Sequence, residues 1–185
     1  MLFLCACRYD RVYHNRFLRY KIKYPEGWIA VNSGHNKQAE NDFKERLNKE
    51  NSPIKNYQNV DVAFYNPDSS PPIFEQITIS SQQGRFNVSR INEMIPLLKN
   101  QFSAFLNSKF KNVKNILSEM EDFKDGKIFR FEYYFNYNKV EYFTVYIIIP
   151  GKLFGTYYIN GICKKNNIAK FNENFNYVLN SFNKY

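Results

Sequence analysis

The stretch from Lys127 to Cys163 constrains the fold of this chain more strongly than any other part of the sequence. It reads KIFRFEYYFNYNKVEYFTVYIIIPGKLFGTYYINGIC, and its many aromatic and β-branched residues favour strands. Residues 136–139 can form a first turn. Pro150-Gly151 can form a second, because proline fixes φ and glycine accepts a positive φ. The stretch therefore predicts three consecutive antiparallel strands, with the rest of the chain arranged to cover the sheet they begin.

The remaining secondary structure is predicted from the spacing of apolar residues. Period-two alternation indicates strands, and apolar residues three and four positions apart indicate helices. Strands are expected over 17–25, 28–31, 59–65, 73–80 and 113–123, and helices over 38–48, 90–110 and, after a cap at Asn166 or Asn167, towards residue 185. The first helix has only Phe43 and Leu47 as an apolar stripe and is expected to lie exposed, whereas the two other stripes are typical of helices that pack on a sheet.

These elements predict an α+β fold in one domain. Consecutive strands with tight turns favour a mainly antiparallel sheet, here of six to seven strands, flanked by the long helices. A chain of 185 residues with 44% hydrophobic and 18% aromatic residues can bury a core without disulfides, and this composition excludes a disordered chain. No internal repeat or linker divides the sequence, so residues 17–185 are expected to form a single domain.

The first sixteen residues are set apart from that domain. Residues 1–7, MLFLCAC, are too few to span a membrane, and they lack the basic start of a signal peptide. Leu4-Cys5-Ala6-Cys7 nevertheless resembles a bacterial lipobox, in which the chain is cleaved before the cysteine and the cysteine is lipidated. We therefore expect 1–16 to be the remnant of a lipoprotein signal with Cys7 as the lipid attachment residue, followed by a polar tether over 8–16. The alternative is a chance apolar N terminus.

The chain carries a formal net charge of +9, which suits an anionic partner such as nucleic acid, a membrane surface or an acidic protein. The charge is uneven, because residues 8–23 hold six basic residues and one acidic residue, while 119–125 is acidic. A soluble nucleic-acid-binding protein is thus an alternative, with Tyr133, Tyr137 and Tyr142 as exposed aromatics that could stack on bases. No RNP-like motif accompanies them, so no specific nucleic-acid partner is expected. Lysine-rich codon usage is the simpler explanation of the charge.

No sequence motif predicts catalysis, a cofactor or a metal. The chain has no P-loop, GxGxxG, GxSxG or HExxH. Its three cysteines and two histidines, without CxxC, cannot assemble a metal cluster, and Cys163 is expected to be a small buried hydrophobe. Glu132 and Glu141 could face each other across the first hairpin and perform acid–base chemistry, which keeps a hydrolase as a second alternative. Strand glutamates that alternate with apolar residues usually face water, so we expect no enzyme and no cofactor.

One short motif and the order of the later elements are shared with a known family. The motif is YKIKYPEGW over 20–28, a hydrophobic strand that ends in Y-P-x-G-W. A long helix follows, then the strands DGKIFRFEYYF and KVEYFTVYIII, a further strand, and a terminal helix that ends in Asn-Ser-Phe at 180–182. Together these features, over most of 17–183, resemble the PsbP/Mog1-like family. The resemblance implies an α/β/α sandwich around an antiparallel sheet.

The resemblance also bears on function. Members of the PsbP/Mog1-like family include an extrinsic subunit of photosystem II, a Ran-binding nuclear import factor, and many bacterial secreted proteins and lipoproteins of unknown role. None of these roles needs a catalytic site, and the acidic binding surface of the import factor is not evident in this basic chain. The resemblance and the lipobox-like start together predict a non-enzymatic binding or assembly module of the bacterial cell envelope. We expect it to be extracytoplasmic, held to the membrane by a lipid anchor and bound to a protein partner, with ligand and oligomeric state left open.

Overall fold

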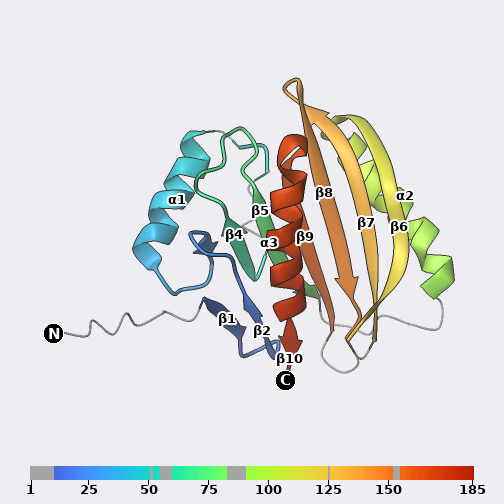
Figure 1. Ribbon diagram of the computed structural model, residues 1–185, viewed down its shortest axis with the longest axis horizontal. Helices are drawn as coiled ribbons and strands as arrows, with labels where there is room; N and C mark the ends of the chain where they lie inside the picture. Colours follow the sequence, from blue (N-terminus) through green and yellow to red (C-terminus); the bar gives the residue numbers. More distant parts are fainter. Residues whose placement is uncertain (1–10, 51, 55–59, 83–90, 125, 152–154) are drawn as a thin grey trace.

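A seven-stranded antiparallel sheet forms the centre of the computed structural model, which describes residues 11–50, 52–54, 60–82, 91–124, 126–151 and 155–185 (Figure 1). The strand order within these residues is β3-β4-β5-β9-β8-β7-β6, and every neighbouring pair is antiparallel. The strands are β3 (Ile29–Val31), β4 (Val62–Tyr65), β5 (Gln76–Gln82), β6 (Lys111–Phe123), β7 (Gly126–Tyr137), β8 (Val140–Ile149) and β9 (Thr156–Lys164). The predicted α+β fold with a mainly antiparallel sheet is confirmed.

The stretch over 127–163 supplies β7, β8 and β9, which are adjacent in the sheet as its composition predicts. Asn138 and Lys139 make the two-residue turn between β7 and β8. Both have the positive φ, 48° and 63°, that such a tight hairpin turn requires. Side chains on both faces of β8 and β9 are buried, because helices cover the sheet from both sides.

Helix α3 (Ile168–Ser181) covers one face of the sheet, and a 3-10 turn, η3 (Lys165–Asn167), precedes it (Figure 1). The buried residues of this helix come from its predicted apolar stripe: Phe171, Phe175, Val178 and Leu179. Gly161 in β9 faces them, and a Cβ atom at that position would lie 2.6 Å from Phe171 Cζ and 2.7 Å from Phe175 Cδ2. The missing side chain therefore lets α3 lie directly on the strand.

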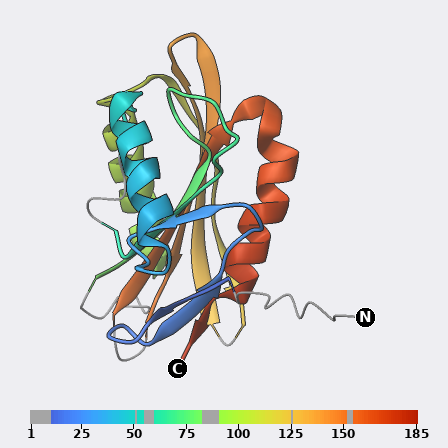
Figure 2. The same cartoon turned by 90° about the vertical axis from the view of Figure 1, so that its left-hand side faces the viewer.

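Helices α1 (Lys37–Lys49) and α2 (Ile91–Asn107) both lie on the opposite face (Figure 2). The expectation that the first helix is exposed is wrong, since Phe43 and Leu47 are both buried. The ring of Phe43 packs on Tyr65 and Phe74, with ring centroids 5.0 and 5.6 Å apart, and so forms a separate small core over β3 and β4. Helices on both faces confirm the α/β/α sandwich.

A three-stranded sheet lies at one end of the molecule, at the bottom of Figure 1. Its middle strand β2 (Tyr20–Lys23) pairs antiparallel with β1 (Val12–Asn15) and with the C-terminal β10 (Asn183–Lys184). The polar tether expected over 8–16 is therefore wrong for Val12–Asn15. Tyr13 is buried with Tyr20 in the same core cluster as the apolar residues of α3, which makes this segment part of the folded unit.

Phe175→Ala tests the packing of α3 on the sheet. We expect the substitution to lower the free energy of unfolding by about 3 to 5 kcal/mol, the usual loss for a buried Phe ring, because Phe175 is fully buried against β9. Tyr177→Ala is the control on the same helix. Tyr177 is 49% exposed, so this change should cost less than about 1 kcal/mol. Urea unfolding followed by circular dichroism measures both, and a Phe175→Ala midpoint equal to that of wild type would contradict the packing.

Candidate functional site

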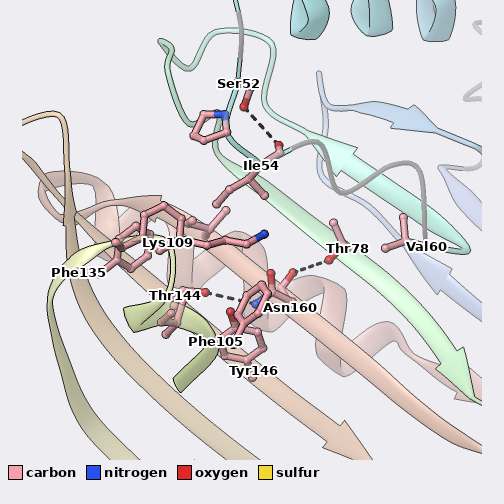
Figure 3. Close-up of a pocket in the computed structure, with 14 residues that line it drawn as sticks. Ser52, Ile54, Val60, Thr78, Phe105, Lys109, Phe135, Thr144, Tyr146 and Asn160 are labelled. Carbon is pink, nitrogen blue, oxygen red and sulfur yellow. Dashed lines mark hydrogen bonds between the residues drawn. The ribbon is translucent and has the colours of Figure 1, made fainter. Parts of the chain in front are cut away.

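A cavity of about 520 Å³ lies on the sheet face that carries α1 and α2, between the end of α2 and the segment after α1 (Figure 3). Sites for small molecules typically have volumes of about 300 to 1,000 Å³. Strands β5, β9 and β8 form most of its floor. Residues 105–110, at and just after the end of α2, form one wall, and residues 52–54 and 60 form another. Because α1 packs on β3 and β4 while α2 packs on β6 and β7, the cavity lies over the strip of sheet between these two helices.

Polar side chains from neighbouring strands make the floor of the cavity. Thr78 in β5 is opposite Asn160 in β9, and Asn160 is opposite Tyr146 in β8, so the antiparallel register places these three in a row. Asn160 Nδ2 donates hydrogen bonds to Thr144 Oγ1 at 3.3 Å and to the main-chain oxygen of Val145 at 3.2 Å. These bonds hold the Asn160 amide in one orientation, so the floor presents polar groups in a fixed arrangement.

Tyr146 joins the polar floor to the apolar part of the site. Phe102 of α2 stacks on its ring, with centroids 4.5 Å apart. Burial raises the pKa of Tyr146 to about 12, although hydrogen bonding with Thr144 and Asn160 acts in the opposite direction. Tyr146 thus contributes a neutral hydroxyl to the lining of the cavity.

Apolar side chains form the walls, and one cation stands among them. Phe105 and Phe110 come from the wall beside α2, and the Phe110 ring stacks on Phe135 with centroids 4.2 Å apart. Lys109 is the one charged side chain among the described residues that line the cavity. Its Nζ lies 4.7 Å from the centroid of the Phe105 ring and extends into the cavity (Figure 3). A polar floor, apolar walls and a single cation suit a ligand that is partly apolar and carries a negative charge.

The two glutamates considered for acid–base chemistry do not face each other. Glu132 lies opposite Val145, and Glu141 lies opposite Asn136, because the two-residue turn fixes the register of this hairpin. Each carboxylate has its own cation instead. Arg130 Nε donates to Glu132 Oε1 at 2.7 Å, and Lys165 Nζ donates to Glu141 Oε2 at 2.9 Å. The paired-carboxylate hypothesis is therefore wrong.

The tyrosines considered as a stacking surface for nucleic-acid bases are not exposed. Tyr133 and Tyr142 are fully buried, and Tyr137 is half-buried. Tyr133 donates its hydroxyl to the main-chain oxygen of Lys99 at 3.1 Å, so even its polar end is occupied. These side chains belong to the core beneath α2, because α2 covers the face of β7 and β8 from which they project.

The structure also bears on the expectations for the cysteines, for a metal site and for a membrane-spanning helix. Cys163 is buried as expected, and burial raises the pKa of its thiol, which makes it a poor nucleophile. Cys7, the expected lipid attachment residue, lies outside the described residues. Within the described part of the chain, no cluster of His, Cys, Asp and Glu could hold a metal ion. No helix described there is long and apolar enough to cross a membrane.

Sequence reasoning missed the cavity. Its polar floor residues did leave a signal, since Thr144 interrupts the apolar run FTVYIII and Asn160 interrupts YYINGIC. Both positions are buried or half-buried in a central strand, where a polar side chain needs a partner. The sequence does not show that Lys109, which precedes Thr144 and Asn160 by about 35 and 50 residues, lines the same cavity.

Comparison with solved structures settles the fold. No family model and no curated sequence matches the chain. The solution structure of cyanobacterial PsbP (CyanoP) from Synechocystis matches it with a TM-score of 0.61, covering 94% of this chain and 91% of CyanoP at 15% sequence identity. This chain has the PsbP-like fold. The structural match thus confirms the fold that the Y-P-x-G-W motif and the element order implied.

Two further solved structures support the PsbP-like fold. A protein of Bacteroides thetaiotaomicron matches with a TM-score of 0.54 at 15% identity, over 95% of this chain and 48% of its own. LpqN of Mycobacterium tuberculosis, described as involved in cell envelope biogenesis, matches with a TM-score of 0.51 at 8% identity, over 88% of this chain and 81% of LpqN. At such identities the likeness establishes the PsbP-like fold alone, a fold consistent with a binding or assembly module.

Proposed function

We propose that this chain is a non-enzymatic binding module of the bacterial cell envelope, extracytoplasmic and membrane-anchored, whose binding site is the cavity beside α2. The observation that carries the proposal is the cavity itself, about 520 Å³ in volume, with a polar floor and apolar walls. Small-molecule sites are typically concave, mostly apolar and equipped with a few fixed polar groups that orient the ligand. Asn160 and Tyr146 supply such groups here.

The chemistry of the lining favours a small carboxylate with an apolar body. Lys109 can donate a charge-assisted hydrogen bond to a carboxylate, and no Asp or Glu is found among the described lining residues to repel one. Phe105, Phe110 and Ile162 offer apolar contact area for the rest of the ligand. Such a ligand would lie with its apolar part against these walls and its charge at Lys109.

Titration with decanoate and with decanol tests this ligand class, because the two probes share an alkyl chain and differ in charge. We expect decanoate to bind more tightly than decanol. Lys109→Glu should weaken decanoate binding at least about tenfold, since it replaces the cation by a repelling carboxylate, and should leave decanol binding unchanged. Isothermal titration calorimetry measures both.

The control for this titration is Lys111→Glu. Lys111 is an exposed residue of β6 that does not line the cavity, and its substitution changes the net charge by the same amount. It should leave both affinities as in wild type. Absence of decanoate binding, or binding that Lys109→Glu and Lys111→Glu affect equally, would overturn the assignment of the cavity.

The proposed membrane anchor is a lipidated Cys7. β1 begins at Val12, so a lipid at Cys7 would hold the three-stranded sheet close to the membrane. The likeness to LpqN, a protein involved in cell envelope biogenesis, supports an envelope location. A single acyl chain binds membranes only marginally, with a constant of about 10⁴ M⁻¹, whereas a lipidated cysteine of the bacterial type would supply several chains.

Membrane fractionation of cells that express the native gene tests the anchor. Wild type should fractionate with membranes, and Cys7→Ser should be soluble or retain an uncleaved signal, because the acylated sulfur is gone. Cys5→Ser is the matched control and should behave as wild type. A soluble wild type whose Cys7 is unmodified by mass spectrometry would rule out the anchor.

A further inference from the structure

The turn between β1 and β2 presents an aromatic side chain to solvent among basic residues. Phe17 at this turn is 79% exposed. The next most exposed large apolar side chain in the described residues, Tyr185, is 56% exposed and lies beside the same turn, because its main-chain nitrogen donates to Arg19 O at 3.0 Å. Exposed apolar groups that gather in one place mark interaction sites more often than scattered ones do.

The three-stranded sheet that carries Phe17 is basic. Residues 12–23 and 183–185, which make up the three-stranded sheet and its turn, contain five Lys or Arg residues and no Asp or Glu. Arg16, Lys21 and Lys23 are exposed, and none of them forms an ion pair within the described residues. We refer to Arg16, Phe17, Arg19, Lys21 and Lys23 as the basic hairpin patch.

The inner side of the hairpin is fixed to the core, so the exposure of Phe17 is built into the fold. Tyr20 is fully buried and donates its hydroxyl to Asp61 Oδ2 at 3.1 Å. Tyr157 donates to the main-chain oxygen of Leu18, next to Phe17, at 2.8 Å. The turn itself is closed by a hydrogen bond from the Leu18 main-chain nitrogen to Asn15 Oδ1 at 2.9 Å. With its neighbours held inward, Phe17 projects from the end of the molecule.

We propose that the basic hairpin patch docks on an anionic lipid surface, with Phe17 inserted at the boundary between headgroups and acyl chains. An aromatic ring is favourable at this boundary, and basic side chains around it are attracted to anionic headgroups. The inference deepens the proposed function, since it concerns the same membrane, and it adds an electrostatic and an aromatic contact to the lipid at Cys7. Only residues 8–11 separate Cys7 from β1, which leads directly into the patch.

Vesicle co-sedimentation of the full chain in the Cys7→Ser background tests the patch without the anchor. We expect binding to vesicles of phosphatidylcholine with phosphatidylglycerol, and little binding to phosphatidylcholine alone. Arg16→Glu combined with Lys21→Glu should lower the partition coefficient about tenfold or more through lost attraction to the headgroups. Phe17→Ser should lower it severalfold at unchanged charge, because the ring no longer inserts.

Two controls match these changes elsewhere on the surface. Lys111→Glu with Lys114→Glu makes the same charge change at the start of β6. The patch lies nearer the other end of β6, where Lys124 donates to the main-chain oxygen of Phe182, next to β10. Leu97→Ser removes a side chain of α2 that is 55% exposed. Both controls should bind vesicles as the parent does. Equal losses in the patch variants and the controls would overturn the proposal in favour of diffuse attraction by net charge.

The fluorescence of Phe17→Trp distinguishes a membrane from other polyanions. Trp28 is already buried, so the new indole should account for any shift of emission to shorter wavelength when anionic vesicles are added. No shift with vesicles, or the same shift with a single-stranded oligonucleotide, would overturn the membrane assignment. An unmodified Cys7 in cells would remove the anchor and leave this vesicle result standing, so the two proposals fail separately.

Discussion

The close contact between Gly161 and the rings of Phe171 and Phe175 is the packing on which the rest of the structure depends. It joins α3 to β9, and β9 lies between β5 and β8 near the middle of the sheet. Protein interiors are packed as densely as organic crystals, so a helix that approaches a strand this closely leaves no room for even one methyl group. The position of α3 in turn places Phe182 and β10, which holds the three-stranded sheet to the main body through its pairing with β2.

β9 contributes to both faces of the sheet because successive side chains along a strand point to opposite sides. Gly161 faces α3, while Asn160 and Ile162 on either side face the cavity. On one face α3 packs directly on β9, whereas the other face is shared between α1 and α2, which pack on separate strands. A site on this fold thus lies where two helices leave a strip of sheet between them, and the polar residues of that strip can serve a ligand without weakening the core under α3.

The sequence pattern predicted correctly those elements whose structure depends on residues close together in the chain. The meander over 127–163 and the stripe of α3 follow from strand composition, a two-residue turn and helical spacing, and the structure has them as predicted. The burial of Phe43 in α1 depends on Tyr65 and Phe74, which lie far along the chain, and no periodicity within α1 contains that information. Likewise β1 becomes a strand through pairing with β2, so its short polar sequence looked like a tether. The candidate site draws on α2, three strands and the segment after α1, and only the three-dimensional structure brings these together.

The stability of Gly161→Ala tests this account of the fold most directly. A Cβ atom there would meet Phe171 and Phe175 at less than 3 Å, so α3 must shift or the rings must leave their positions. We expect a loss of about 1 to 3 kcal/mol in the free energy of unfolding, the usual cost of overpacking. Gly126→Ala at the start of β7, where the added atom meets nothing within 4 Å, should change it by less than about 0.5 kcal/mol. Equal unfolding midpoints for Gly161→Ala and wild type would contradict the close packing of α3 on β9.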